Sequence, residues 1–148
     1  MKLKFQKFKA KDFKEYKSWF QDADLNRELG PMDQEWIDYT LKEKDGQTYG
    51  VFSKGKLVAV AEVKFPNPEH TYYVITSIAV KPSLRKKGIG SQVLQELVKL
   101  HSLKKNQYWK AFVNTKNKTA KLFLEKNAWI CESEIPDEHG IITFELKQ

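Results

Sequence analysis

Cysteine and histidine are scarce in this 148-residue sequence, which has one cysteine and three histidines. Because Cys131 is the only cysteine, an internal disulfide is excluded, and a reducing, cytoplasmic location is expected. The histidines, His70, His101 and His139, lie far apart and show none of the spacings typical of metal ligands. We therefore expect no metal site.

Long apolar runs are also missing. No run approaches the roughly 20 residues that a membrane-spanning helix needs. Residues 1–9 alternate apolar and charged side chains instead of forming the apolar core of a signal peptide. The hydrophobic fraction of 41% and the aromatic fraction of 13% are typical of globular proteins. We expect a single domain over residues 1–148 and no membrane partner.

Acidic residues are few in one part of the chain and concentrated in another. Residues 81–126 hold twelve Lys and Arg against two Glu, a net charge of +10 within a chain of net charge +7. Residues 22–45 hold eight Asp and Glu against three Lys and Arg, a net charge of −5. The basic part favours an anionic partner, either a nucleic acid or a phosphorylated cofactor. The alternative is that scattered lysines only keep the surface soluble.

Hydrophobic periodicity predicts about seven strands and about four helices. The predicted strands are 3–8, 48–53, 56–65, 71–80, 108–113, 129–134 and 141–146. The predicted helices are those that begin with Asp12 and Asp33 as N-caps, and 88–101 and 117–126. Because a helical crossover separates strands 71–80 and 108–113, they are expected to be parallel neighbours. The fold class is therefore α/β (α+β), with a mixed, mostly antiparallel sheet.

A basic, glycine-spaced loop joins strand 71–80 to helix 88–101. Its sequence is Arg85-Lys86-Lys87-Gly88-Ile89-Gly90-Ser91. Amides in the first turn of a helix have no intrahelical acceptor, and the helix dipole adds positive potential there. Gly88 and Gly90 allow a ligand to approach the backbone closely. The loop therefore predicts a phosphate site, although it is neither a P-loop nor a dinucleotide fingerprint.

This strand, loop and helix resemble the acetyl-CoA motif of the GCN5-related N-acetyltransferases, the GNAT superfamily, which reads Gln/Arg-x-x-Gly-x-Gly/Ala. A second family pattern is Asn-x-x-Ala-x-x-Leu/Phe-Tyr-x-Lys-x-Gly-Phe/Trp. It is matched at Asn117, Ala120, Phe123, Lys126 and Trp129. The order of the predicted elements also matches the family, so the resemblance covers nearly the whole chain. It implies an enzyme that transfers an acetyl group from acetyl-CoA to a primary amine by direct attack.

The resemblance also implies a cofactor site. In the family, the strand before the loop splays away from its parallel neighbour, and the pantetheine arm of acetyl-CoA hydrogen-bonds to backbone in the gap. The matching positions are Ile78, Ala79 and Val80, whose side chains can belong to the core in either case. The pyrophosphate would lie on Arg85, Lys86, Lys87, Gly88, Ile89, Gly90 and Ser91. Asn117 would contact the cofactor arm.

The reaction also needs acid and base groups. The tyrosine that acts as general acid in many family members is replaced by Leu124, which cannot donate a proton. Tyr108, Ser83, Thr115 and Cys131 are alternatives. The strand that leads to the loop contains no carboxylate, so Glu62 on the preceding strand is the candidate catalytic base. Alternatively, Glu62 is a surface residue paired with Lys64, and a water chain removes the proton.

In the family, the helices after the first strand shape the acceptor pocket. Trp19, Leu25, Glu28 and Trp36 are the candidate substrate-binding residues here, and the acidic excess of this region favours a small cationic amine or a peptide. The alternative is that these acids are helix caps and surface charges. A homodimer is compatible with the sequence.

Two other functions are compatible with the sequence. A basic nucleic-acid-binding protein would use the lysines near Tyr108, Trp109 and Phe112. No RNA-recognition or helix-turn-helix pattern supports it, so we do not expect a nucleic-acid partner. A catalytically silent acyl-CoA sensor on the same fold would be consistent with Leu124.

Overall fold

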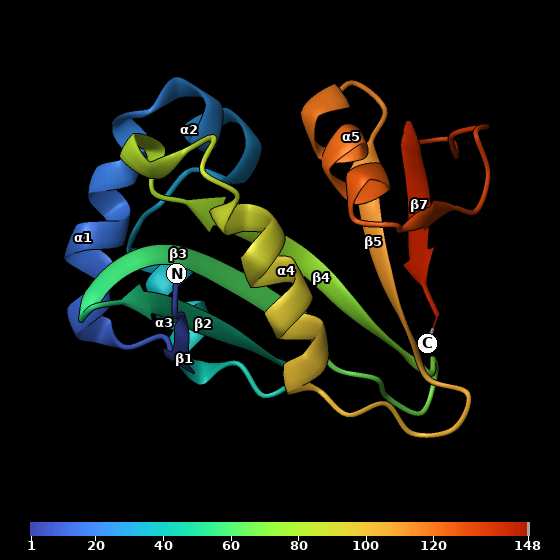
Figure 1. Ribbon diagram of the computed structural model, residues 1–148, viewed down its shortest axis with the longest axis horizontal. Helices are drawn as coiled ribbons and strands as arrows, with labels where there is room; N and C mark the ends of the chain where they lie inside the picture. The colour runs from blue at the N-terminus through green and yellow to red at the C-terminus, as the bar shows by residue number, and fades with distance from the viewer. Residues whose placement is uncertain (148) are drawn as a thin grey trace.

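The computed structural model describes residues 1–147 (Figure 1). Its strands are β1 (Lys4–Lys7), β2 (Gly46–Ser53), β3 (Lys56–Lys64), β4 (Tyr72–Val80), β5 (Tyr108–Asn114), β6 (Ile130–Cys131) and β7 (Ile141–Leu146). Its α-helices are α1 (Phe13–Ser18), α2 (Ala23–Leu29), α3 (Gln34–Lys42), α4 (Ile89–Leu100) and α5 (Lys118–Lys126). Short 3₁₀ turns are η1 (Ala10–Asp12), η2 (Trp19–Gln21) and η3 (Pro82–Leu84). Among these residues, no helix is long and apolar enough to cross a membrane.

The strands form one seven-stranded sheet in the order β1-β2-β3-β4-β5-β7-β6. All neighbouring strands are antiparallel except β4 and β5, which are parallel. The mixed, mostly antiparallel sheet and its parallel pair are therefore confirmed. A two-residue turn at Lys54 and Gly55, both with positive φ, closes the β2–β3 hairpin that the sequence predicts.

The parallel pair is short. Only Tyr72 to Val74 of β4 pair with Tyr108 to Lys110 of β5. Beyond Val74 the two strands separate, and Figure 1 shows them meeting near the bottom of the view and diverging toward the top. The splayed strand pair that the resemblance implies is therefore present.

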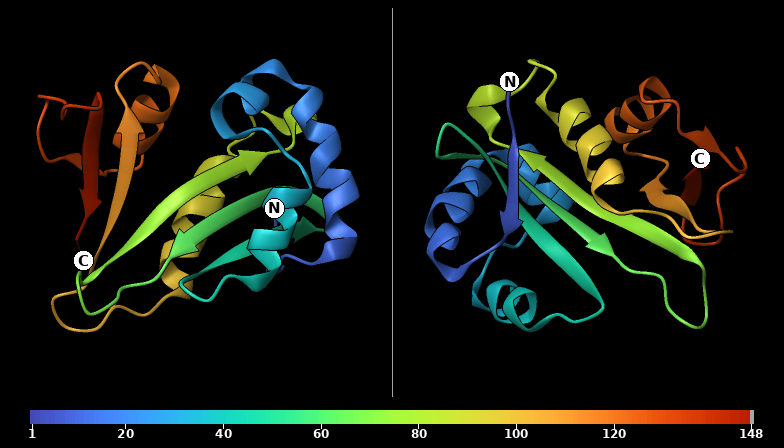
Figure 2. Two further views of the ribbon diagram at one scale, coloured as in Figure 1. Left: turned by 180° about the vertical axis from the view of Figure 1, so that it is seen from behind. Right: turned by 60° about the horizontal axis from the view of Figure 1, so that its bottom comes forward.

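Helices cover both faces of the sheet. Helices α4 and α5 pack one face in a core that includes Leu94 and Leu97 of α4, Leu124 of α5 and Trp109 of β5. Segments α1 to α3 cover the opposite face, where a second core contains Tyr16, among others. Figure 2 shows α1 and α3 on the side of the sheet away from α4. The gap between β4 and β5 thus lies between two helical layers.

The first helical region differs from the prediction. It contains an additional helix, α2, whose N-cap is Asp22: the Leu25 N–H donates to the Asp22 carboxylate at 3.1 Å. Asp33 caps α3 as predicted, because its side chain accepts from the Trp36 N–H at 3.0 Å. Asp12 does not cap α1 through its side chain, which instead accepts from the Lys9 N–H at 2.9 Å.

The predicted strand 129–134 is also shorter than expected. Strand β6 contains only Ile130 and Cys131, although the Glu132 N–H still donates to Thr143 O at 2.8 Å. Beyond it, the Ser133 hydroxyl accepts from the Ile135 N–H at 3.2 Å. This local hydrogen bond offers the backbone an alternative to the sheet ladder, so the strand ends early.

Candidate functional site

The gap between β4 and β5 leaves one edge of β4 without a strand partner. Along its other edge, β4 pairs with β3 up to Val80, which lies opposite Ala59. Strand β5 pairs with β4 only as far as Val74, so among residues 1–147 the edge of β4 that faces the gap has no strand partner from Ile75 to Val80. Unpaired strand edges bind extended chains through main-chain hydrogen bonds. The candidate residues Ile78, Ala79 and Val80 lie on this edge.

A β-bulge shapes the same part of β4. Glu62 of β3 lies opposite Ser77, whereas the next residue, Val63, lies opposite Ile75, so Thr76 is the extra residue. Thr76 is exposed, and its hydroxyl donates to the carboxylate of Glu62. Bulges redirect side chains and bend strands. At this bulge, Thr76 of β4 contacts the carboxylate of Glu62, which lies on β3 along the paired edge of β4.

The basic loop closes the end of the gap. Gly88 is the N-cap of α4 with φ +78°, and a Cβ there would meet nothing within 4 Å. A Cβ on Gly90 would lie 3.4 Å from Phe123 of α5 and 3.6 Å from Val80 of β4. The loop therefore packs directly on the end of β4 and on α5, and its open side is at Gly88.

Free amides and lysines face this open side. The Gln92 N–H donates to Gly88 O at 3.1 Å, so the amides before it belong to the first turn, where helices have no internal acceptor. Lys86, with φ +63°, and Lys87 are exposed and have no ion-pair partner among residues 1–147. Consecutive amides in a first helical turn, beside a helix dipole and ammonium groups, are groups that commonly bind anions in proteins.

Arg85 is held differently from the two lysines. Its guanidinium donates two hydrogen bonds to the carboxylate of Asp22, at 3.0 and 2.6 Å. The hydrogen bond from Arg85, followed by that from the Leu25 amide, holds the pKa of Asp22 below its usual value. A second ion pair joins Lys81 to Glu15 of α1 at 3.1 Å. These contacts fasten the basic loop to the helices of the first region.

Asn117 stands on the opposite side of the gap. It is the N-cap of α5, accepting from the Ala120 N–H at 3.1 Å, and its amide nitrogen contacts Glu28 of α2 at 3.3 Å. Because Asp22 at the start of α2 contacts Arg85, this helix links the β4 side of the gap to the β5 side. Figure 1 shows α2 near the end of β4 and α5 beyond the end of β5.

Glu62 lies on the face of the sheet that α1 and α3 cover. Besides Thr76, it contacts Lys64 at 3.7 Å, so the ion pair considered as an alternative role is present. Tyr16 of α1 is close enough to feel its charge: burial, and then the charge of Glu62, raise the pKa of Tyr16 well above its usual value. The sequence did not point to Tyr16 as a neighbour of Glu62, because its aromatic spacing fits a core position.

Comparison with known proteins identifies the fold and the family. The model of the acetyltransferase (GNAT) family matches residues 13–129. The chain belongs to the GNAT acetyltransferase family. It is 27% identical over 146 residues to the uncharacterized N-acetyltransferase YfmK of Bacillus subtilis (strain 168), a match that covers 97% of this chain and 96% of that protein.

Solved structures share the fold at low sequence identity. An acetyltransferase from Thermus thermophilus has a TM-score of 0.82 at 13% identity, covering 99% of this chain and 97% of that one. The ribosomal L7/L12 α-N-protein acetyltransferase RimL, in complex with coenzyme A, has a TM-score of 0.76 at 12% identity, covering 97% and 93%. Likeness at this identity shows the GNAT fold alone.

Two residues considered for functional roles, Leu124 and Trp109, are buried in the core. Leu124, at the position of the family tyrosine, is 6% exposed and packs in the core under α5. Trp109, considered as a stacking residue for nucleic acid, is fully buried and stacks on Tyr73 at 4.8 Å between ring centroids. Of its neighbours in that hypothesis, Phe112 is half exposed.

The candidate acceptor residues have different surroundings. Trp19 is 4% exposed and Leu25 is buried, and both belong to the second core; Trp36 is partly buried and packs against Phe8 and Tyr16. Glu28 is exposed. The three apolar side chains therefore hold α1, α2 and α3 on the sheet, while Glu28 faces outward toward α5.

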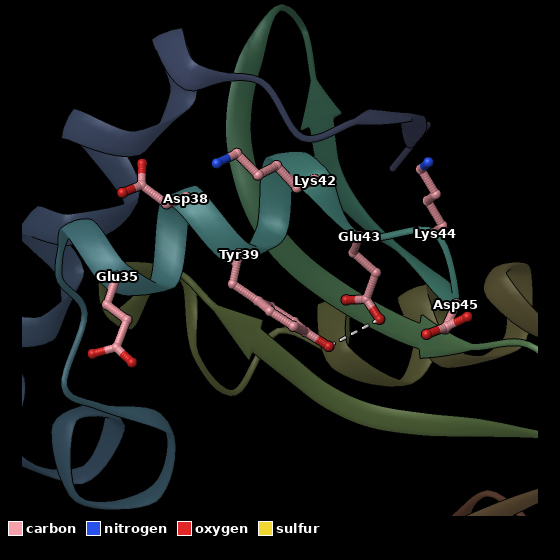
Figure 3. A pocket seen from close by; sticks show the side chains of 7 residues that line it. All are labelled: Glu35, Asp38, Tyr39, Lys42, Glu43, Lys44 and Asp45. Carbon is pink, nitrogen blue, oxygen red and sulfur yellow. Dashed lines mark hydrogen bonds between the residues drawn. The ribbon is translucent and has the colours of Figure 1, made fainter.

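A shallow pocket lies away from the gap, on α3 and the turn that follows it. Figure 3 shows its side chains: Glu35, Asp38, Tyr39, Lys42, Glu43, Lys44 and Asp45. The Tyr39 hydroxyl donates to Glu43 at 3.2 Å. Within residues 1–147, no group of His, Cys, Asp and Glu side chains is arranged to hold a metal ion.

Proposed function

We propose that this GNAT protein transfers an acetyl group from acetyl-CoA to the primary amine of a small cationic molecule or a peptide. The observation that carries this proposal is the unpaired edge of β4, which ends at the basic, glycine-spaced N-terminus of α4. The two features match the two parts of the cofactor: the amide-rich pantetheine arm suits a strand edge, and the pyrophosphate suits first-turn amides.

The donor site uses backbone more than side chains. Ile78, Ala79 and Val80 offer backbone groups to the pantetheine arm, and Asn117 reaches it from α5. The pyrophosphate binds the amides of residues 87–91, with Lys86 and Lys87 adding charge. Arg85 contributes mainly by fixing the loop, because Asp22 already occupies its guanidinium.

The reaction needs a neutral amine and a polarised thioester. The amine lone pair attacks the carbonyl carbon, the C–S bond breaks, and the nitrogen loses a proton. In the proposal, Glu62 accepts this proton, directly or through one water. A backbone N–H at Val80 or a neighbouring residue stabilises the developing oxyanion. The thiolate leaves toward solvent, because Leu124 offers it no proton.

The acceptor wall is formed by α1 and α2. Trp19, Leu25 and Trp36 set the position of this wall from within, and Glu28 presents a carboxylate at its outer surface. Residues 22–45 carry a net charge of −5, which attracts an ammonium group and disfavours anionic acceptors.

The test is release of free coenzyme A from acetyl-CoA with a panel of amines: polyamines, aminoglycosides, basic and acidic peptides, and anionic amines. Glu62→Gln keeps the shape of the side chain and its hydrogen bond from Thr76. We expect it to lower kcat by roughly 10²- to 10⁴-fold, the usual range for loss of a general base. Glu125→Gln, an exposed acid on α5, is the control and should change kcat little.

Three results would contradict parts of this proposal. Full activity of Glu62→Gln would remove Glu62 from catalysis, and a preference for anionic acceptors would contradict the acceptor class. Binding of acetyl-CoA without thiol release for any amine would instead favour a silent acyl-CoA sensor, a function that the buried Leu124 supports.

A further inference from the structure

A partly buried polar seam lies between β3 and the end of α3, beside the proposed base; Glu43 is its buried member and Tyr39 is exposed. Its centre is the ammonium of Lys64, which two carboxylates share. Glu43, at the end of α3, makes a direct hydrogen-bonded ion pair with Lys64, whereas Glu62 lies 3.7 Å away. The Tyr39 hydroxyl is also 3.0 Å from the Lys64 ammonium. Figure 3 shows Tyr39 and Glu43 pointing toward each other from α3.

The register of the sheet explains how α3 reaches Lys64. Lys64 and Glu62 are two residues apart on β3, so they point to the same face, as does Val60. At one end of α3, Ile37 packs in the second core with Val60; at the other end, Glu43 binds Lys64. The helix therefore runs along this row of β3 residues. A change of charge at Glu43 therefore acts on the Lys64 ammonium and, through it, on Glu62.

Burial decides which carboxylate holds the ammonium. The Glu43 side chain is 4% exposed and that of Glu62 is 21% exposed. A buried carboxylate is costly unless it is paired, and an ion pair is stronger where water is excluded. Burial lowers the pKa of Lys64, but its hydrogen bond to Glu43 and the neighbouring carboxylates outweigh burial and raise that pKa. Lys64 therefore stays charged and stays with Glu43.

Few other charges face Glu62. From β3 it faces Lys64; from α1, the neutral hydroxyl of Tyr16; from β4, the hydroxyl of Thr76. Thr48 of β2 lies directly opposite it in the sheet. Two carboxylates and one ammonium leave one negative charge in the seam. Because Glu43 hydrogen-bonds to the ammonium, Glu62 has the longer of the two ion pairs.

Unsatisfied polar atoms mark the same place. Within the described chain, four buried side-chain polar atoms have no hydrogen-bond partner: Thr40 Oγ1, Thr48 Oγ1, Glu43 Oε2 and Trp109 Nε1. Three of them come from α3, its end, and the strand position opposite Glu62. Such atoms in native proteins are explained by bound water or by a functional site.

We propose that Glu43 is a positioning residue for acetyl transfer, acting on Glu62 through Lys64. By hydrogen-bonding to the Lys64 ammonium, Glu43 keeps that ammonium 3.7 Å from the Glu62 carboxylate, without a direct hydrogen bond, and Glu62 accepts a proton from the acceptor amine more readily as a result. The inference rests on the proposed function, in which Glu62 is the base. Lys64 is then the movable charge, and the two carboxylates compete for it.

The test compares three variants by the pH dependence of kcat/KM with a cationic amine that the wild-type protein acetylates. Glu43→Gln releases the ammonium to Glu62. A contact ion pair stabilises an ionised carboxylate, so the acid limb of the profile should move to lower pH by about one unit. The plateau should also fall, because a weaker base accepts the proton less readily. Adding Lys64→Met to Glu43→Gln removes the ammonium and should move the acid limb back to higher pH.

The control is Asp38→Asn, an exposed acid on the same helix whose only side-chain hydrogen bond in the described chain is the one it accepts from Gln34. It should leave the profile unchanged. A uniform loss of activity in Glu43→Gln, with the acid limb unmoved, would mean that Glu43 serves structure alone. The proposal would also be overturned if the acid limb of the kcat/KM profile lay at the same pH in Glu43→Gln and in Glu43→Gln combined with Lys64→Met.

A measurement on the free protein separates this inference from the proposed function. The carboxyl ¹³C signal of Glu62 should titrate at lower pH in Glu43→Gln than in the wild-type protein, whether or not any amine is acetylated. If that signal shifts but no amine is acetylated, the ion-pair competition holds and the proposed function fails. If amines are acetylated but the signal does not shift, the competition is refuted.

Discussion

Gly88 and Gly90 offer a matched pair of substitutions for the cofactor loop. The two glycines are separated by one residue, yet their surroundings are opposite. An alanine methyl at Gly88 would project into open space beside the amides proposed for the pyrophosphate. The same methyl at Gly90 would make ordinary contacts with Phe123 and Val80. We predict that Gly88→Ala weakens acetyl-CoA binding and that Gly90→Ala does not.

The effects on folding are expected to be small and different in sign. Gly88 has φ +78°, where an L-residue costs roughly 1–2 kcal/mol, so Gly88→Ala should unfold a few degrees below the wild-type protein. Gly90 lies inside α4 with ordinary helical backbone. Replacing it with alanine should change the free energy of unfolding by no more than about 1 kcal/mol, in the stabilising direction.

Thermal unfolding with and without acetyl-CoA separates folding from binding. At about 100 times its Kd, a ligand stabilises the folded state by about 2.7 kcal/mol, and each tenfold loss of affinity removes about 1.4 kcal/mol of this. A tenfold loss in Gly88→Ala would therefore halve the ligand-induced shift in Tm. A full shift in Gly88→Ala, or an equal loss in Gly90→Ala, would refute the assignment of the open side of the loop.

Two further predictions concern stability. Burial lowers the pKa of His101 below its ordinary 6.5, so the unfolded chain binds more protons at acid pH than the folded chain does. The free energy of unfolding should therefore be highest above about pH 6.5 and should fall as the pH drops through the folded-state pKa. In urea unfolding, His101→Gln should reduce this pH dependence. Leu124→Ala should lower the free energy of unfolding by roughly 2–5 kcal/mol because Leu124 is buried. Leu122 is exposed on the same helix, so Leu122→Ala should change the free energy of unfolding by less than about 0.5 kcal/mol. Equal losses of stability in the two variants would contradict the core position of Leu124.

The central part of the fold could be predicted from the sequence because its signals are local. Strand β4, the basic loop and α4 follow one another along the sequence. Hydrophobic periodicity marks the strand and the helix, and closely spaced glycines mark the loop. Helix α2 was missed because Ala23–Leu29 has few apolar residues and runs into Gly30-Pro31, which reads as loop. Its N-cap, Asp22, belongs to the acidic excess of residues 22–45, for which helix capping is one of the two roles that the sequence allows.

The site depends on contacts that the sequence cannot show. Arg85 and Asp22 are 63 residues apart, and only the packing of α2 against the loop joins them. Glu62 could be selected because it interrupts an apolar strand, but its partner Glu43 has no distinguishing pattern. Trp19 and Leu25 are residue types that occur both in binding pockets and in cores, and in the folded protein both are buried in the core.

The central claim is that acetyl-CoA binds along the open edge of β4 and across the N-terminus of α4. Titration of acetyl-CoA into ¹⁵N-labelled protein, followed by amide chemical shifts, tests it most directly. We predict that the largest shifts fall on Ile78 to Val80 and on residues 87–91, with a smaller effect at Asn117. Shifts confined to other surfaces, such as the pocket on α3, or none at saturating acetyl-CoA would contradict it.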